Sequence, residues 1–289
     1  MKKESPLALS YFPGCSLHST AREYDASTRA VCDALDIELR ELEDWNCCGS
    51  TSAHSINAEL ARLLPMRNLE IAERAGRDLM VPCAACYGRS KAAEAELKEV
   101  ADSGEGTFYT GQIKINHVLD VFVEEDVLEK LKEKVTRPLA GLKVVCYYGC
   151  LTTRPPKVTG ATDYEFPESM DRLVELIGAT ALPWSYKTDC CGASLTLTRS
   201  DVVVRLVDRL LVMAEEAGAE CIAVACTMCH ANLDARQEEA AAQFGRQHKM
   251  PVFYISELLG LAMGHPDASQ WWKRHLTDPL ELLNAIELA

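Results

Sequence analysis

One cysteine pattern occurs twice in this 289-residue chain and accounts for ten of its thirteen cysteines. Each copy has a single cysteine, then an adjacent pair followed by glycine, then a Cys-x-x-Cys motif. The first copy comprises Cys15, Cys47, Cys48, Cys83 and Cys86, and the second comprises Cys150, Cys190, Cys191, Cys226 and Cys229. In both copies thirty-four residues lie between the pair and the Cys-x-x-Cys motif. Two equal thiol sets predict two metal centres in a duplicated chain.

The residues around the cysteines also repeat. Each Cys-x-x-Cys motif follows a short apolar run, at 79–82 and at 222–225, which is typical of a buried strand. A helical pattern that ends in Ala-Gly precedes each run, at 60–76 and at 203–218, and glycine just past a helix is a C-cap signal. A further helix-like stretch follows each motif.

Those following stretches lie near 87–101 and 230–244. Alternating strands and helices predict βαβ units. The fold class is therefore expected to be α/β, with two pseudo-symmetric halves, mostly parallel sheets and one five-cysteine site in each half. We place the first cysteine-rich domain at 1–137 and the second at 138–289. A charged helix-like run at 125–134 marks the join, and residues 101–107 are expected to form a surface loop.

The predicted topology brings the thiols of each half together. Cys15, Cys83, Cys150 and Cys226 each directly follow an apolar strand, and the adjacent pairs follow strand-like segments at 37–42 and 181–184; ligands of open α/β sheets bind beyond the carboxyl ends of the strands. All five thiols of one half can therefore gather at one end of its sheet.

Thiolates are soft ligands that select zinc, copper(I) or iron–sulfur clusters. A structural zinc site needs four ligands, and so does a cubane cluster, whereas each half offers five. Adjacent cysteines can reach two different metal atoms, so the count favours iron–sulfur. Zinc, and thiol redox chemistry without metal, remain as alternatives.

The two cysteine sets resemble the cysteine-rich CCG domain of the heterodisulfide reductase B subunit, over most of the chain. Residues 12–17, Asn46-Cys47-Cys48-Gly49 and 82–86 resemble the first copy in that family, and 148–155 and 189–192 resemble the second. Members of the family often carry histidine directly after the first cysteine of the second copy, where this chain has Leu151.

The resemblance implies two non-cubane [4Fe-4S] clusters, each held by the five cysteines of one copy. It also implies that a disulfide is placed between the clusters and reduced to two thiols. Electrons would arrive from the ferredoxin-like C subunit of the complex, supplied by its flavin-containing A subunit. The disulfide itself, small-molecule or protein, is not specified by the resemblance.

The charge and the motifs of the chain limit the kinds of molecule that it is expected to bind. The formal net charge of −13 argues against general binding to nucleic acid or to an anionic membrane. No apolar run approaches the ~18 residues of a membrane span, and nothing resembles a signal peptide, so we expect a cytoplasmic protein. No Gly-x-Gly-x-x-Gly fingerprint for a dinucleotide and no ferredoxin motif occur. The chain is thus expected to depend on partner subunits for its electrons.

For several residues outside the ten cysteines, a structural role and a functional role are alternative interpretations. We expect Cys32 and Cys221 to be buried structural thiols, and Cys146 to pack in the core or to contact the second cluster. His18, His54 and His230 lie near cysteine motifs as surface residues or as hydrogen-bond donors to sulfur. The basic residues after the motifs form solvated helix faces or a mouth for an anionic disulfide: Arg22, Arg29, Arg89, Arg154 and Lys157. Trp271 and Trp272 are expected in the core rather than in a docking patch.

Two functions compete beside a zinc-stabilised binding protein. The first is a catalytic subunit that reduces a disulfide. The second is an electron-transfer subunit of another oxidoreductase complex, such as those that oxidise lactate, glycolate or glycerol phosphate or that reduce fumarate. Chains of the second kind often carry ferredoxin motifs or incomplete cysteine sets, and this chain has neither trait, which favours the first.

Overall fold

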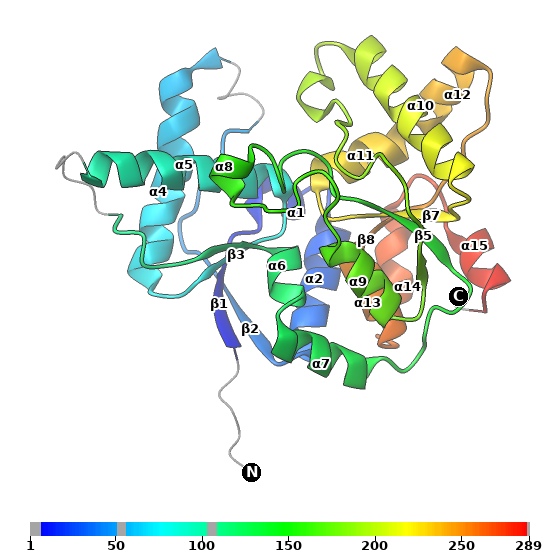
Figure 1. The fold of residues 1–289 in the computed structure, drawn as a ribbon, viewed down its shortest axis with the longest axis horizontal. Helices are drawn as coiled ribbons and strands as arrows, with labels where there is room; N and C mark the ends of the chain where they lie inside the picture. The colour runs from blue at the N-terminus through cyan, green and yellow to red at the C-terminus, as the bar shows by residue number, and fades with distance from the viewer. Residues whose placement is uncertain (1–6, 51–55, 103–108, 288–289) are drawn as a thin grey trace.

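Two four-stranded sheets lie side by side in the computed structural model, which describes residues 7–50, 56–102 and 109–287 (Figure 1). The first half contains β1 (Leu7–Tyr11), α1 (Gly14–Leu17), α2 (Arg22–Ala34), β2 (Ile37–Glu41), α4 (Ala58–Ala75), β3 (Leu79–Val81), α5 (Ala84–Asp102), β4 (Ile115–His117) and α6 (Val118–Phe122). Helix α7 (Glu125–Lys134) then leads to the second half.

The second half repeats this order with additions near its end. It contains β5 (Lys143–Tyr147), α8 (Pro156–Thr159), α9 (Ser169–Leu176), β6 (Thr180–Ala181), η1 (Ala193–Leu195), α10 (Ser200–Glu216), β7 (Cys221–Val224), α11 (Thr227–Ala235), α12 (Gln237–Phe244), β8 (Val252–Tyr254), α13 (Ile255–Ala262), α14 (Ala268–Trp271), η2 (Trp272–Arg274) and α15 (Leu280–Ala285).

The two sheets have the same topology. Their strand orders are β2-β1-β3-β4 and β6-β5-β7-β8, and every pairing is parallel. The predicted α/β class, with two pseudo-symmetric halves, is confirmed. All strands of one sheet therefore end at the same edge, where the cysteine loops follow.

Local sequence explains the helices that frame the cysteine loops. The Asn57 side chain caps α4 by accepting a hydrogen bond from the Leu60 N–H (2.9 Å). The same helix ends at Gly76, whose positive φ of 67° suits a residue without Cβ. The C-cap signal of the sequence was therefore correct at this position.

Three predicted elements differ from the structure. The stretch 230–244 is two helices, α11 and α12, because the backbone turns at Arg236 and the Gln237 amide binds the Leu233 and Met250 carbonyls. The strand expected at 181–184 is only β6, because Pro183 has no N–H for a further ladder bond. Residues 101 and 102 of the expected loop end α5, and the rest of that loop lies outside the described residues.

The sequence interpretation missed the fourth strand of each sheet and the helix that follows it. β4 leads directly into α6, and β8 leads directly into α13. At both junctions a carboxylate of the new helix accepts from the backbone N–H of the last strand residue: Asp120 from His117 (2.7 Å) and Glu257 from Tyr254 (2.9 Å).

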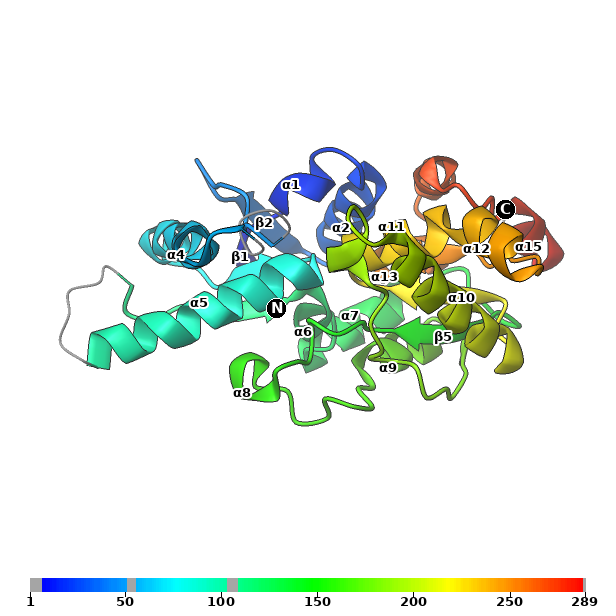
Figure 2. The ribbon, with the colours of Figure 1, turned by 90° about the horizontal axis from the view of Figure 1, so that it is seen from above.

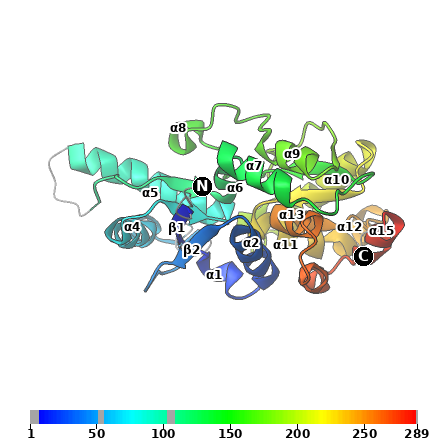
Figure 3. The ribbon, with the colours of Figure 1, turned by 90° about the horizontal axis from the view of Figure 1, so that it is seen from below.

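These missed helices join the halves. α13 packs against α2 of the first half, and α6 packs against α9 of the second, so each half covers part of the other (Figure 3). The Ser27 and Ser256 hydroxyls lie 2.7 Å apart in the buried contact between α2 and α13. Helix α8 also reaches α5 of the first half (Figure 2). The halves therefore share one hydrophobic core, which places both sets of cysteine loops in a fixed relation.

None of the helices in the described part of the chain combines the length with the apolar composition that a membrane span requires. Trp271 and Trp272 are buried at 5% and 4% exposure, which confirms the core interpretation. Trp271 packs on Gly260 of α13, where a Cβ would lie 2.5 Å from the indole ring.

Gly260→Ala is therefore expected to destabilise the protein by about 1–3 kcal/mol, because the added methyl displaces the Trp271 ring from a close-packed core. Urea unfolding of the purified protein measures this free energy. Gly218→Ala is the control, since its Cβ would meet no atom within 4 Å and only its positive φ of 79° resists substitution. An unchanged stability of Gly260→Ala would contradict the packing described.

Candidate metal centres

The five thiols of the first copy converge beyond the carboxyl ends of β1 and β3. Cys15 and Cys47 have their Sγ atoms 3.9 Å apart, and Cys48 is in hydrogen-bonding contact with Cys86, which in turn contacts Cys83. The Gly49 N–H points at the Cys47 sulfur (3.4 Å). Cys15 and Cys47 are exposed, whereas the other three are buried.

The second copy repeats this arrangement beyond β5 and β7. Cys150 contacts Cys190, and Cys191 and Cys229 have their sulfurs 3.7 Å apart. Cys226 contacts Cys229, and the Gly192 N–H points at the Cys190 sulfur (3.3 Å). The structure therefore brings together all ten cysteines that the sequence singled out, as two sets of five.

A glycine precedes the first cysteine of each set, and both glycines are needed for close approach. Gly14 and Gly149 have positive φ angles of 72° and 68°. A Cβ on Gly14 would lie 2.8 Å from the Cys86 sulfur, and one on Gly149 would lie 2.8 Å from the Cys229 sulfur. Any side chain there would intrude on the thiols, so the backbone forms part of the wall of each site.

The two sets meet at the first cysteine of each Cys-x-x-Cys motif. The thiols of Cys83 and Cys226 lie close enough across the junction of the halves to shift each other's pKa. The Thr227 hydroxyl also lies 3.3 Å from the Cys83 sulfur. The candidate centres are therefore neighbours rather than separate sites.

His117, at the end of β4, holds this junction. Its Nδ1 accepts from the Leu119 N–H (3.4 Å), which assigns the ring proton to Nε2. Nε2 lies 3.1 Å from both the Pro82 and the Ala225 carbonyls, the residues just before Cys83 and Cys226. Burial lowers the pKa of His117 although the Asp120 carboxylate opposes this, so the neutral ring donates to both carbonyls. Sequence reasoning missed His117, which no spacing rule connects to either motif.

A cavity of about 220 Å³ opens between the halves beside the second set. All five thiols of that set line it, together with residues of both halves, including Ala84, Arg89, Leu151 and Met228. Leu151 packs on Gly88 of the first half, where a Cβ would lie 3.3 Å from the Leu151 Cβ. The cavity wall is thus largely apolar, with one guanidinium at its edge.

Arg89 is the only one of the five basic candidates that lines this cavity. Arg22 donates to the His18 carbonyl (3.3 Å), Arg29 pairs with Asp25 and Glu41, and Arg154 donates to the Thr188 hydroxyl (3.0 Å). Lys157 is exposed on α8. Arg89 donates to the Ala61 carbonyl (2.7 Å), and its buried Nε has no hydrogen-bond partner among the described residues. Of the five basic residues predicted to surround the entrance for an anionic disulfide, one, Arg89, therefore lies at the cavity.

Within each set the first cysteine of the adjacent pair is the most acidic of the exposed thiols. Hydrogen bonds from Cys15 and Cys48 lower the pKa of Cys47. The hydrogen bond from Cys150 lowers the pKa of Cys190 to about 6, and the Gly192 N–H assists. The same bonds raise the pKa values of Cys15 and Cys150. The pKa values of Cys83 and Cys191 are lowered as well, by hydrogen bonds from neighbouring thiols, so both sets favour thiolate, the form that binds metal.

The residues fit an iron–sulfur centre in donor chemistry and in shape. Each site gathers five soft sulfur donors, and a glycine without a Cβ lies against one of them. Five thiols exceed what a tetrahedral zinc needs, and the adjacent pair can reach two metal atoms.

The histidines near the motifs have other partners. His18 pairs with Glu41 (2.9 Å) and contacts the Trp45 ring, so it is a surface residue. His54 lies outside the described residues. His230 is buried, stacks on Tyr254 at 4.2 Å, and has its Nε2 3.0 Å from the Val252 carbonyl.

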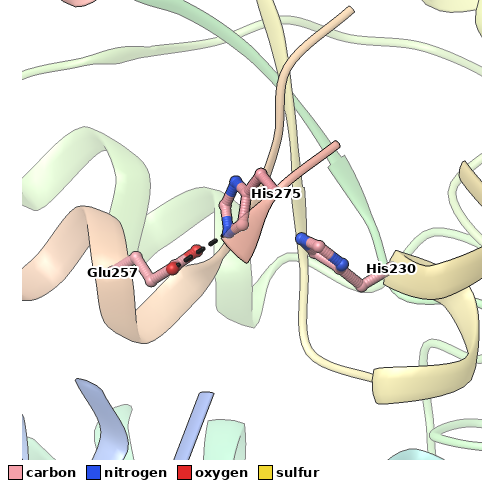
Figure 4. A group of neighbouring side chains, drawn as sticks. All are labelled: His230, Glu257 and His275. Atoms are coloured by element: carbon pink, nitrogen blue, oxygen red, sulfur yellow. Dashed lines mark hydrogen bonds and ion pairs between the residues drawn. The ribbon is translucent and has the colours of Figure 1, made fainter. Parts of the chain in front are cut away.

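His230 also belongs to a buried group with Glu257 and His275 whose possible ligand atoms lie within 4.8 Å of one another (Figure 4). His275 Nε2 lies 3.1 Å from Glu257 Oε1. Burial opposes protonation of His275, but the Glu257 carboxylate outweighs it and raises the pKa of His275. A histidine that holds its proton against a carboxylate is a poor metal ligand. We interpret this group as an anchor for the chain after α14, not as a metal site.

The remaining cysteines are apart from the thiol sets. Cys32 in α2 and Cys221 at the start of β7 are buried, as expected, and burial raises the pKa of each thiol. Cys146 is buried, and burial and then the nearby Asp171 carboxylate raise the pKa of its thiol. It does not share a face with Cys150, because β5 ends at Tyr147 and the chain turns at Gly149.

The thiol pKa values predict an order of alkylation in the reduced, metal-free protein. At pH 7, iodoacetamide should modify Cys47 and Cys190 before Cys15 and Cys150, because thiolate is the nucleophile. Below pH 6 the rate at Cys190 should fall about tenfold per pH unit. Peptide mass spectrometry of timed samples gives the rates. Cys15 controls for access, since it is exposed like Cys47; equal rates at the two would contradict the assignment.

His117→Phe should destabilise the protein by about 1–3 kcal/mol, because it keeps the ring but leaves the buried Ala225 carbonyl without its donor. His117→Gln should recover part of this loss, since its amide can still donate. Tyr24→Phe is the matched control: it removes a hydroxyl from the Pro82 carbonyl (2.9 Å), which His117 still serves. Urea unfolding under anaerobic conditions ranks the three. A loss in Tyr24→Phe as large as that in His117→Phe would refute the bridging role.

The chain is similar to known proteins over nearly the full length of both sequences. A family model described as a cysteine-rich domain, CCG, matches residues 9–89 and 144–234. The chain is 30% identical to the 8-methylmenaquinol:fumarate reductase membrane anchor subunit of Wolinella succinogenes, over 98% of this chain and 100% of the relative. It is 32% identical to the B subunit of the ferredoxin:CoB-CoM heterodisulfide reductase of Methanosarcina mazei, over 96% of both.

Two further similarities are more distant. A protein of Archaeoglobus profundus, named as similar to the heterodisulfide reductase B subunit, is 29% identical over 88% of this chain and 89% of its own. The crystal structure of a hypothetical protein from Helicobacter pylori superposes with a TM-score of 0.69 at 12% identity. That match covers 94% of this chain but 52% of the other, so the chain spans about half of that protein, and the likeness concerns the fold alone.

Proposed function

The chain belongs to the cysteine-rich CCG-domain family that includes the heterodisulfide reductase B subunit, and we propose that it is the disulfide-reducing subunit of a larger oxidoreductase complex. One observation carries the proposal. The two five-thiol sets meet at Cys83 and Cys226, and a cavity opens between the halves at this junction. Reduction of a disulfide takes two electrons and two protons, and two neighbouring one-electron centres can supply both electrons.

The ten cysteines are the proposed ligands of two non-cubane [4Fe-4S] clusters. Cys15, Cys47, Cys48, Cys83 and Cys86 would hold the first, and Cys150, Cys190, Cys191, Cys226 and Cys229 the second. When bound, the clusters supply one electron each to the disulfide. The glycine walls at Gly14 and Gly149 leave room for inorganic sulfur, and the lowered pKa values of Cys47 and Cys190 favour metal binding at neutral pH.

The cavity is the proposed seat of the disulfide. Leu151 and Met228 provide apolar contacts for the arms of the substrate, and the thiols of the second set line the cavity beside them. Arg89 lines the cavity, so its guanidinium would bind an anionic group on one arm, because a guanidinium pairs well with carboxylate, sulfonate or phosphate. The substrate is accordingly proposed to be a small disulfide with at least one anionic end.

Electrons are proposed to come from partner proteins. The sequence has no dinucleotide fingerprint, and its relatives are named as lettered subunits of reductases. A ferredoxin-like partner, equivalent to the C subunit of the family's complexes, and a flavin-containing partner, equivalent to their A subunit, are the expected suppliers. The exposed thiols of Cys15 and Cys47 bring the first centre close to the surface, where such a partner can approach. We place the assembly in the cytoplasm.

A second candidate is an electron-transfer role in a fumarate reductase-type complex. The full-length match to the Wolinella protein, named as the membrane anchor of such a reductase, favours it. In that role the clusters would pass electrons between partners and the cavity would bind no disulfide. The discriminating observation is therefore disulfide-dependent oxidation of the reduced chain.

The test is to purify the chain anaerobically and to measure iron and acid-labile sulfide. We expect about eight of each per chain, since two clusters of four are proposed. The reduced protein should then be reoxidised by small anionic disulfides, and Arg89→Gln should raise the KM more than it lowers kcat. Cys191→Ala should abolish turnover, whereas Cys221→Ala, a buried thiol outside both sets, should retain it. Zinc in place of iron, or no reaction with any disulfide, would overturn the proposal.

A further inference from the structure

The two thiol sets have equal ligands but unequal surroundings at their point of contact. Thr227, the first residue of α11, lies in the second half, and its Oγ1 lies 3.3 Å from the sulfur of Cys83 in the first half. Both residues are buried, at 3% and 4% exposure. A cysteine that binds metal has lost its proton, so in the loaded protein Thr227 must be the donor.

Among the described residues, no hydroxyl takes the equivalent position beside the sulfur of Cys226. The pseudo-symmetric counterpart of Thr227 is Ala84, the residue after Cys83, and its methyl group cannot donate to Cys226. Ala84 borders the cavity and is buried, at 1% exposure. The second set has a different polar neighbour, Asn232, whose amide donates to the Cys191 carbonyl (3.0 Å) and lies beside its thiol. Among the described residues, the first set alone therefore has a sulfur that lies beside a hydroxyl of the opposite half.

A hydrogen bond to a ligand sulfur acts on the redox couple. One-electron reduction adds negative charge to a cluster and its thiolates, and an O–H dipole that points at one sulfur stabilises this charge more than it stabilises the oxidised state. Hydrogen bonds to the sulfurs are one of the factors that set the reduction potential of such centres. The effect is strong where the pair is buried, because little water screens it.

We infer that Thr227 is a positioning residue which raises the reduction potential of the first-half centre from the opposite half, so that the two centres are inequivalent. This inference rests on the proposed function in that it requires both clusters, but it does not depend on the substrate. Because Thr227 directly follows Cys226, a ligand of the second centre, a shift of that loop would also alter the donor to the first centre. The two centres are therefore linked through one hydroxyl.

The experiment is a redox titration of the reconstituted full-length chain, followed by electron paramagnetic resonance. Thr227→Val removes the hydroxyl at nearly constant shape, and Thr227→Ser keeps it. In Thr227→Val one of the two midpoint potentials should fall, with a roughly tenfold change in the ratio of reduced to oxidised centre, ~59 mV for one electron, while the other stays fixed. Thr227→Ser should behave as the wild type. Ala84→Thr is the matched gain variant and should raise the other potential.

A second measurement compares the wild type directly with the two Thr227 variants. Electron–nuclear double resonance in D2O should show an exchangeable deuteron at the first cluster that Thr227→Val loses and Thr227→Ser keeps, whereas the deuterons of the Gly49 and Gly192 N–H groups should be the same in all three proteins. Unmoved potentials in both Thr227→Val and Ala84→Thr, or equal shifts of both couples, would overturn the inference. A chain that loads both clusters and shows these shifts, yet reduces no disulfide, would support the inference and contradict the proposed function. A chain that reduces a disulfide while its potentials stay unchanged in the variants would support the proposed function and contradict the inference.

Discussion

The contact between the two Cys-x-x-Cys loops is the constraint on which the rest of this molecule depends. Cys83 and Cys226 lie near each other across the junction of the halves, and one imidazole, that of His117, binds the carbonyl before each of them. Two buried carbonyls that share one neutral donor fix the distance between the loops. Any chemistry that uses both thiol sets together requires this fixed distance.

The exchange of helices between the halves makes this contact possible. Each sheet ends in a short strand that leads directly into a helix, and each of these helices, α6 and α13, packs on the other half. The carboxyl edges of both sheets are thereby turned toward each other. The cavity beside the second thiol set is a consequence of this arrangement, because Arg89 comes from one half and Leu151 from the other.

The two halves have nearly the same fold, but the residues where the halves meet differ. The two sites therefore have different properties. The glycine walls, the thiol contacts and the N–H bonds to Cys47 and Cys190 repeat almost without change. At the junction, however, equivalent positions of the two halves carry different residues. Thr227 corresponds to Ala84, and His117 corresponds to Tyr254. A duplicated scaffold thus holds similar donor sets, while a few junction residues distinguish them.

The sequence by itself determined the ten cysteines, their division into two sets, and the parallel α/β halves, because these follow from fixed spacings and from local periodicity. It did not indicate β4 or β8, since three residues carry too little pattern to be recognised. It could not select Arg89 from five basic residues, nor connect His117 to Ala225, 108 positions away. Such pairings arise only when the halves pack together, and packing of distant segments is a property of the tertiary structure alone.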